Sequence, residues 1–271
     1  ACTADLERDI TAICYDSRKA EPGCLFVAVS GFAADGNRFI PMALEKGAVA
    51  VVTAKAPEGA VPHILVASDR LALALLGCNF YGNPAASMTM IGITGTNGKT
   101  TTKELVSAVL SEKHNVMFTQ GNFNNDVGVP KTLFRLNAEH EIAVVEMGAS
   151  HPGDIEKLVK YVEPTCGMIT NVGRAHLQGF GSFEGVKKTK GELYDFLAAH
   201  DALVFINADN EHLMQMAEER NINRLITYGK DGECDVWGEV ISCAPFLKFR
   251  WRTESFDWHE VQTHLIGSYN I

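Results

Sequence analysis

The sequence predicts an α/β protein in which a small N-terminal α/β domain precedes a P-loop-type central domain. From Met88 onward, short apolar runs alternate with helix-compatible stretches, and one of these runs leads into a Gly-rich turn followed by Lys and Thr. Continuous apolar strands between helices are typical of a mostly parallel sheet flanked by helices. Aromatic residues gather near residues 234–266, and short strands at Trp237, Phe246–Trp251 and Phe256–Trp258 are predicted to form a small antiparallel portion there.

The first 84 residues form the smaller predicted unit. Apolar runs indicate strands at 25–29, 48–52 and 63–66, and helical stretches lie between them, near 38–46 and 70–80. The segment Tyr81-Gly82-Asn83-Pro84 is rich in turn-forming residues. We therefore place the domain boundary there, which gives domains at 1–84 and 85–271.

The larger domain is predicted to alternate strands with helices. Strands are expected at 88–93, 142–146, 167–171, 202–207 and 224–227. Helices are expected near 101–113, 129–136, 155–161, 186–199 and 211–220. Ligands of such sheets bind at the carboxyl ends of the strands, so residues that directly follow the apolar runs are the candidates for a site.

Composition indicates an ordinary globular enzyme. The chain has 271 residues, of which 46% are hydrophobic, enough for a packed core. The net charge of −9 argues against a surface for nucleic acid or anionic membranes. No apolar run reaches the roughly 18 residues that span a bilayer. The seven cysteines are scattered without a C-x-x-C pair, so we expect buried, reduced thiols in a cytoplasmic protein. We also expect the protein to be a monomer.

The most informative motif is Gly95-Thr96-Asn97-Gly98-Lys99-Thr100-Thr101, which lies between an apolar run and a helix-compatible stretch. Gly95 and Gly98 lack a Cβ, which allows backbone N–H groups to close around phosphate oxygens, and the helix start adds unpaired N–H groups. Lys99 would neutralise outer phosphates, and the Thr100 hydroxyl could ligate Mg²⁺. The motif therefore predicts a site for a nucleoside triphosphate.

This loop is shorter than the common G-x-x-x-x-G-K-[ST] motif, because Ile93 stands where the first Gly is usual. The alternative interpretation is a Gly-rich strand-to-helix turn with an incidental Lys. The order of the strand, turn and helix favours the phosphate-binding interpretation.

Polar residues directly follow three of the predicted strands. Glu146, Asn171 and Asn207 each end an apolar run, and His176 lies five residues after Asn171. A carboxylate opposite Thr100 suits Mg²⁺, which prefers oxygen ligands and retains several waters. His176 is less expected at such a site, and the alternative is a hydrogen-bonded surface histidine.

These residues resemble those of the Mur ligases, the ATP-dependent amide-forming enzymes of peptidoglycan assembly, over almost the whole chain. The G-T-N-G-K-T-T loop is typical of that family and of its folylpolyglutamate synthetase relatives. Within the family, 121–130 (GNFNNDVGVP), 146–153 (EMGASHPG) and 175–182 (AHLQGFGS) resemble the member that joins D-alanyl-D-alanine to UDP-N-acetylmuramoyl-tripeptide. The sibling that adds the third amino acid usually has a Thr-rich segment in place of Asn-Phe-Asn-Asn, and Ser-Ser-His after its glutamate.

The resemblance implies roles for single residues. The loop Gly95–Thr101 would hold the ATP phosphates, and Asn207 and Asn270 would lie around the adenine and ribose. One or two Mg²⁺ ions would be held by Thr100, Glu146, His176 and Lys190, the last of which many members carry as a carbamate. Lys99, Lys190 and His176 would act in catalysis. The UDP-muramoyl-peptide would contact Ser17, Arg18, Asn122, Asn124 and Asn125.

The resemblance also implies a reaction. ATP would phosphorylate the terminal carboxylate of the UDP-muramoyl-tripeptide, and the amine of D-alanyl-D-alanine would attack the acyl phosphate. Family members have three domains and are longer than this chain. We therefore expect a two-domain fragment that lacks the C-terminal domain for the dipeptide and binds the UDP-substrate without completing ligation.

Alternatives stay open at this point. The chain could belong to a third-residue-adding Mur-type ligase or to a folylpolyglutamate synthetase-like ligase. A function of another class is a non-catalytic nucleotide-binding module or switch. The sequence has no N-K-x-D guanine-recognition motif, and the acid at the strand end is Glu146 instead of Asp. Both features argue against a switch GTPase.

Overall fold

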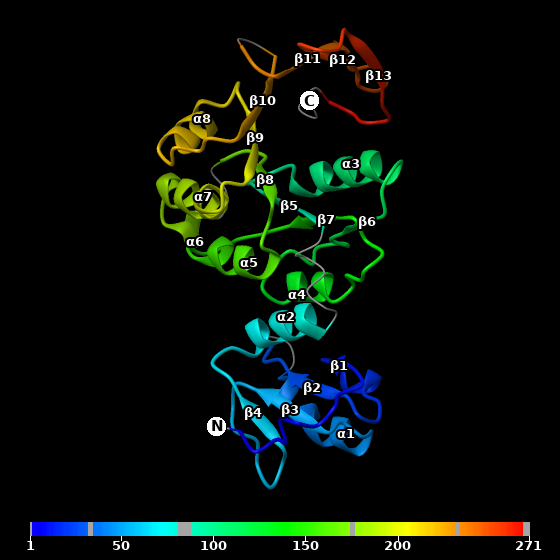
Figure 1. The fold of residues 1–271 in the computed structure, drawn as a ribbon. Helices are drawn as coiled ribbons and strands as arrows, with labels where there is room; N and C mark the ends of the chain where they lie inside the picture. The colour runs from blue at the N-terminus through cyan, green and yellow to red at the C-terminus, as the bar shows by residue number, and fades with distance from the viewer. Residues whose placement is uncertain (1, 32–34, 81–87, 174–176, 231–232, 268–271) are drawn as a thin grey trace. The chain divides into compact units, whose positions relative to one another are not determined.

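The chain folds into two compact units. The computed structural model describes residues 2–31, 35–80, 88–173, 177–230 and 233–267. The first unit comprises 1–87 with 126–138, and the second comprises 88–125 with 139–271. Both are α/β, and the predicted fold class is confirmed, including the mostly parallel sheet and its small antiparallel portion (Figure 1).

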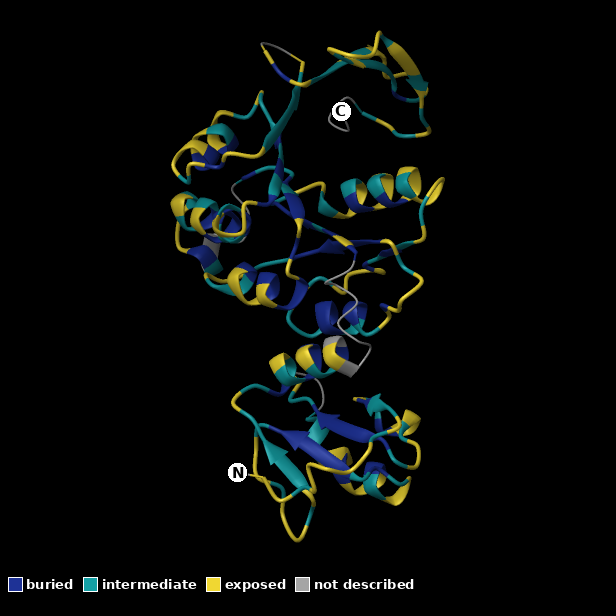
Figure 2. Cartoon of the chain, in the orientation of Figure 1, coloured by how far each residue is buried: buried dark blue, intermediate teal, exposed yellow. Residues whose placement is uncertain are grey.

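The first unit is built on a parallel sheet of four strands in the order β1-β2-β3-β4, namely β1 (Ile13–Cys14), β2 (Leu25–Ala28), β3 (Ala50–Thr53) and β4 (His63–Leu65). Every residue of β2 and β3 is buried (Figure 2). Its helical elements are η1 (Ser17–Lys19), η2 (Gly36–Phe39), α1 (Ile40–Glu45), α2 (Asp69–Phe80) and α4 (Gly128–Leu133).

Segment 126–138 belongs to the first unit, whereas the sequence placed it in the second domain. The carboxylate of Asp126 forms an ion pair with Arg70, near the start of α2. The ring of Phe134 lies against Gly77 of α2, where an added Cβ would come within 2.7 Å of it. Helix α4 therefore packs with α2, a partner that lies about 50 residues earlier and that local sequence pattern does not reveal. The predicted boundary at residue 84 lies outside the described residues.

The second unit contains a nine-stranded sheet in the order β13-β12-β11-β10-β9-β8-β5-β7-β6. Strands β5 to β11 pair in parallel, and they are β5 (Thr89–Thr94), β6 (Val116–Phe118), β7 (Ile142–Glu146), β8 (Cys166–Ile169), β9 (Leu203–Asn207), β10 (Leu225–Gly229) and β11 (Val236–Ser242). After β7 the chain crosses β5 to form β8 on its other side. The end of β5 therefore lies at a topological switch point, where ligands of such sheets bind.

Helices cover both faces of this sheet (Figure 1). The helices of this unit are α3 (Lys99–Ser111), α5 (Asp154–Val162), α6 (Leu177–Phe180), α7 (Phe183–Ala199) and α8 (Glu211–Glu218). Ile93 of β5 shares a core with Val106 of α3. Its neighbour Gly92 meets Leu193 of α7 instead. Successive strand residues point to opposite faces, so α3 and α7 lie on opposite sides of β5.

The antiparallel portion consists of β11, β12 (Lys248–Thr253) and β13 (His259–Gln262). The sequence suggested a strand at 256–258, but these residues lie before β13. The Thr253 hydroxyl accepts hydrogen bonds from the backbone N–H groups of Ser255 and Phe256, and this local turn competes with strand pairing. The expectation of buried cysteines is wrong at Cys2 and Cys243, which are exposed.

Among the described residues, no helix combines the length and the apolar character needed to cross a membrane.

Candidate functional site

The phosphate-binding motif forms the turn between β5 and α3. Gly95 and Gly98 have φ values of 145° and 80°, in the region that favours glycine. A Cβ on Gly95 would overlap the hydroxyl of Thr170, so that position requires glycine for space as well as for conformation. Helix α3 begins at Lys99, directly after the turn, which leaves its first N–H groups facing the loop.

The loop is held from outside by the segment that follows β8. Asn171 accepts a hydrogen bond from the Asn97 backbone N–H at 3.1 Å and donates one to the Asn97 carbonyl at 3.0 Å. The Thr170 hydroxyl donates to the same carbonyl at 2.6 Å. The sequence indicated Asn171 as a strand-end candidate. Its side chain therefore holds the loop by bonding to the backbone of Asn97.

Lys99 turns back onto its own loop. Its Nζ donates to the carbonyl of Gly95 at 2.9 Å and to that of Thr96 at 3.0 Å. Burial lowers the pKa of Lys99, and the nearby Glu146 carboxylate opposes that change. The ammonium thus forms hydrogen bonds with two backbone carbonyls. A charged phosphate oxygen is a stronger hydrogen-bond acceptor than either carbonyl.

Glu146 ends β7 and lies beside the first turn of α3. Its side chain is 1% exposed. Its Oε2 accepts from the Thr100 hydroxyl at 2.9 Å, and its Oε1 accepts from the Asn124 amide at 2.8 Å. Its backbone N–H donates to the Thr119 hydroxyl at 3.0 Å. Two contacts therefore fix this carboxylate and a third fixes the backbone that carries it, and the structure brings the carboxylate to the predicted Thr100.

This pair of oxygens fits Mg²⁺. Adjacent ligands in an octahedron with Mg–O distances of about 2.0–2.1 Å lie roughly 2.9 Å apart. The Thr100 Oγ1 and Glu146 Oε2 atoms have that separation, at 2.9 Å. Within the described part of the chain, no three His, Cys, Asp or Glu side chains cluster as a metal site. A hydroxyl and one carboxylate suffice for Mg²⁺ when phosphate and water supply the other ligands.

Lys190 lies inside α7 and is 3% exposed. Burial and, to a smaller extent, the ammonium of Lys99 lower the pKa of Lys190 against the opposing effect of Asp154 and Glu192, and the resulting pKa is about 8. Its Nζ lies 5.7 Å from the centre of the Phe180 ring. A buried amine of this kind is neutral in part near neutral pH, which a solvated lysine is not.

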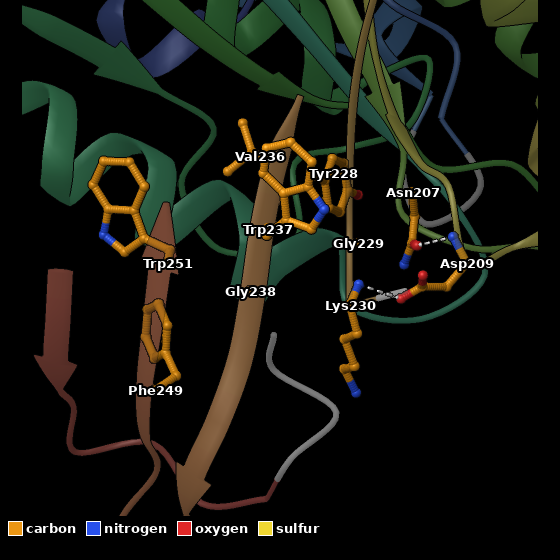
Figure 3. A pocket seen from close by; sticks show the side chains of 10 residues that line it. All are labelled: Asn207, Asp209, Tyr228, Gly229, Lys230, Val236, Trp237, Gly238, Phe249 and Trp251. Atoms are coloured by element: carbon orange, nitrogen blue, oxygen red, sulfur yellow. Dashed lines mark hydrogen bonds between the residues drawn. The ribbon is translucent and has the colours of Figure 1, made fainter. Parts of the chain in front are cut away.

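A pocket of about 290 Å³ opens at the carboxyl ends of β9 and β10 (Figure 3). Asn207 and Asp209 line it together with the aromatic side chains of Tyr228, Trp237 and Trp251. Asn207 Oδ1 accepts from the backbone N–H of Asp209 at 2.9 Å, which fixes the amide at the pocket wall. The sequence indicated Asn207, while its aromatic partners come from strands that only the fold brings there.

The residues predicted for the UDP-substrate have different surroundings. Ser17 is 6% exposed, and its hydroxyl donates to the sulfur of Met42. The Arg18 side chain is 82% exposed and pairs with Asp16 at 2.7 Å, which lowers the pKa of Asp16 to about 2. Exposed ion pairs of this kind contribute little to the stability of the fold, so Arg18 can exchange Asp16 for a ligand at a small cost in free energy.

The predicted asparagines do not act alike. Asn122 is exposed, and its carbonyl accepts from the backbone N–H of Asn124 at 2.8 Å. Asn125 is also exposed. The amide of Asn124 is directed to Glu146 instead. The predictions for His176 and Asn270 lie outside the described residues.

Two residues at this site had no sequence signal, namely Thr119 at the end of β6 and Lys103 in α3. Both are fully buried. Thr119 follows a three-residue strand that the apolar pattern does not show, and Lys103 occupies a helix position where a solvated lysine is usual.

The fold and the loop together define a nucleotide-binding domain of the P-loop class. A glycine-rich turn joins the central parallel strand to a helix N-terminus, and a buried acid on the neighbouring strand faces the Thr of the motif. Comparison with known proteins then gives the family. Residues 93–271 match the Mur ligase middle domain, and residues 9–81 match the domain described as Mur ligase family, catalytic domain. The chain belongs to the Mur ligase family.

Individual relatives show which Mur ligases the chain is similar to. The chain is 41% identical, over 85% of its length, to the UDP-N-acetylmuramoyl-tripeptide–D-alanyl-D-alanine ligase of Synechocystis, of which it covers 51%. It superposes on MurF from Acinetobacter baumannii with a TM-score of 0.84 at 30% identity, covering 97% of this chain and 57% of that one. MurF from Thermotoga maritima in complex with ADP gives 0.83 at 30% identity, covering 96% and 60%. The chain spans about half the length of the curated relatives it matches.

Proposed function

We propose that this chain forms the UDP-substrate-binding and ATP-binding parts of an ATP-dependent ligase that adds D-alanyl-D-alanine to UDP-N-acetylmuramoyl-tripeptide. The observation that carries the proposal is the pairing of the Gly95–Thr101 loop with the buried Glu146 carboxylate, 2.9 Å from the Thr100 hydroxyl. Curated relatives at 33% to 41% identity carry the name of that ligase, and this supports it over the third-residue-adding and folate-adding alternatives.

The nucleotide would lie along the carboxyl edge of the sheet. Its phosphates would occupy the loop after β5, and its base the aromatic pocket at Asn207. Strands β5, β8, β9 and β10 are neighbours, so the two sites are two to three strand spacings apart, roughly 10–14 Å. An extended nucleotide can span this distance. The ADP complex of the Thermotoga relative supports nucleotide use at this fold.

In this mechanism the residues of the loop position the γ-phosphoryl group and stabilise its charge. Lys99 leaves the carbonyls of Gly95 and Thr96 and donates to phosphate oxygens. Thr100 and Glu146 would hold Mg²⁺, which supplies further positive charge to the phosphates. The tripeptide carboxylate attacks the γ-phosphorus, the bond from that phosphorus to the β,γ-bridging oxygen breaks, ADP leaves, and an acyl phosphate forms. The dipeptide amine then attacks the acyl carbon, its nitrogen loses a proton, and the bond from the acyl carbon to the phosphate oxygen breaks so that phosphate leaves.

Binding to the 271-residue chain tests the function directly. We expect calorimetric titration to give tighter binding for UDP-N-acetylmuramoyl-tripeptide than for the corresponding dipeptide or for UDP alone, and tighter ADP binding with Mg²⁺ than with a chelator. Dihydrofolate serves as the control for a folate-adding ligase. Preference for the muramoyl-dipeptide would support a third-residue-adding enzyme. Nucleotide binding without affinity for either muramoyl-peptide would support a non-catalytic nucleotide module.

We also propose that Lys190 carries a carbamate. Only a neutral amine attacks CO₂: its nitrogen forms a bond to carbon, one C=O electron pair moves to oxygen, and the nitrogen loses a proton. Burial lowers the pKa of Lys190 to about 8, so the reactive form becomes abundant as the pH rises through that value. The product is an oxygen-bearing anion, which suits a hard cation.

Labelling with ¹³CO₂ checks the carbamate. We expect a carbamate ¹³C resonance that grows between pH 6.5 and 8.5, because the pKa of Lys190 is about 8. The resonance should disappear in Lys190→Gln and persist in Lys188→Gln, which removes an exposed lysine of the same helix. A resonance that survives in Lys190→Gln, or its absence at pH 8.5, would contradict the assignment.

A further inference from the structure

A buried lysine near the phosphate-binding loop is not used by the mechanism above. Lys103 lies one turn after Lys99 in α3 and is fully buried. Its Nζ donates to the Thr119 carbonyl at 2.7 Å and to the Glu104 carboxylate at 2.5 Å. Burying an ammonium is costly, and an apolar residue at this helix position would avoid that cost. A specific contact therefore accounts for the charge at this position.

The contacts of Lys103 form a closed ring with the candidate metal ligands. Thr100 and Lys103 lie three residues apart on α3, on neighbouring positions of one helix face. The Thr100 hydroxyl bonds the Glu146 carboxylate, and Lys103 bonds the Thr119 carbonyl. The Thr119 hydroxyl closes the ring by accepting the backbone N–H of Glu146 at 3.0 Å.

This ring joins α3 to the ends of two strands. Thr119 directly follows β6, and Glu146 is the last residue of β7. Thr119 is also fixed to β7 by its backbone N–H, which donates to the Val144 carbonyl at 3.0 Å.

Val106 and Leu110 of α3 also pack against β6 and β7. Among the hydrogen bonds of the described residues, those of Lys103 and Thr100 join the helix to this edge. The Thr100 hydroxyl is the group that must turn to a cation when one binds, so the bond from Lys103 is the one that stays.

We propose that Lys103 is a positioning residue for the candidate Mg²⁺ site. It acts through Thr119 to set the 2.9 Å separation of Thr100 Oγ1 and Glu146 Oε2, the spacing of two adjacent octahedral ligands. This inference rests on the proposed function, because it assumes that the loop binds a Mg²⁺-nucleotide. Residues that orient metal ligands from behind typically affect metal affinity 10- to 100-fold.

The test measures how much Mg²⁺ strengthens ADP binding, as the ratio of the ADP Kd with chelator to the Kd with Mg²⁺. We expect Lys103→Met to lower this ratio roughly 10- to 100-fold, while ADP binding in chelator stays close to that of the unaltered chain. Thr119→Val, which removes the acceptor for Glu146, should have the same effect. Thr119→Ser, which keeps the hydroxyl, should restore the ratio.

Ser107→Ala is the matched control. Ser107 lies one turn after Lys103 on the buried face of α3, and its hydroxyl has no hydrogen-bond partner among the described residues. This change should alter thermal stability without lowering the Mg²⁺ ratio. If Lys103→Met does not fold, Thr119→Val against Thr119→Ser gives the same readout.

Two outcomes overturn the inference. One excludes only the positioning role of Lys103, and the other also excludes the magnesium site. If the unaltered chain shows Mg²⁺-strengthened ADP binding and both Lys103→Met and Thr119→Val keep its full ratio, Lys103 has no positioning role, while the proposed function stands. If the unaltered chain binds ADP equally well with Mg²⁺ and with chelator, the magnesium site itself is excluded, and the positioning role falls with it.

Discussion

Replacing Lys99 by Met is expected to weaken ADP binding roughly 10- to 150-fold. The reason is that the change removes a hydrogen bond to a charged phosphate, and such a bond contributes about 1.5–3 kcal/mol. In the free chain its ammonium bonds the carbonyls of Gly95 and Thr96. Phosphate oxygens replace these acceptors when a nucleotide binds. Calorimetric titration with ADP in chelator isolates this contribution from that of Mg²⁺.

Lys113→Met is the control for this change, because Lys113 is exposed and lies just beyond the end of the same helix. It should leave the Kd for ADP almost unchanged. Equal losses in the two variants would show that general positive charge, and not the bond from Lys99, attracts the nucleotide. An unchanged Kd in Lys99→Met would place the phosphates elsewhere.

Replacing Lys190 by Met is expected to stabilise the fold at pH 7 by about 3 kcal/mol in CO₂-free buffer, the equivalent of a pKa drop from 10.5 to about 8. The side chain is 3% exposed, so the native state holds an ammonium that water would otherwise solvate. Methionine keeps a similar length without the charge. Denaturant unfolding of both proteins across pH gives the difference.

The pH dependence distinguishes this origin from better packing. Because the pKa of Lys190 in the folded chain is the lower one, the unfolded chain binds more protons between about pH 8 and 10.5. The stability of the unaltered chain therefore rises over that interval relative to Lys190→Met, and the difference disappears above it. A gain that is constant with pH would mean that packing, and not charge, is responsible. The exposed Lys188→Met should change stability by less than about 0.5 kcal/mol.

Local pattern predicted the elements that carry strong periodicity or glycine chemistry. The run at 142–146 is strand β7 with the same bounds, and the expected helix at 155–161 is α5, one residue longer at each end. Some short elements were not predicted, among them β1 with two residues and β6 with three, although the three-residue β4 was expected at 63–66. Strands of this length carry too few residues for periodicity, and long-range pairing alone stabilises them.

The sequence by itself determined the class of loop, because glycine at positions with positive φ, followed by Lys and Thr at a helix start, is a local requirement. It also determined that Glu146 ends a strand. Only the tertiary structure decided that Glu146 lies 2.9 Å from Thr100, that Asn124 bonds the same carboxylate, and that Lys103 and Thr119 close the ring behind it. The contacts of Thr100 and Lys103 join α3 to strand ends up to 46 residues away, and such partners are set by sheet order and packing, which no local pattern encodes.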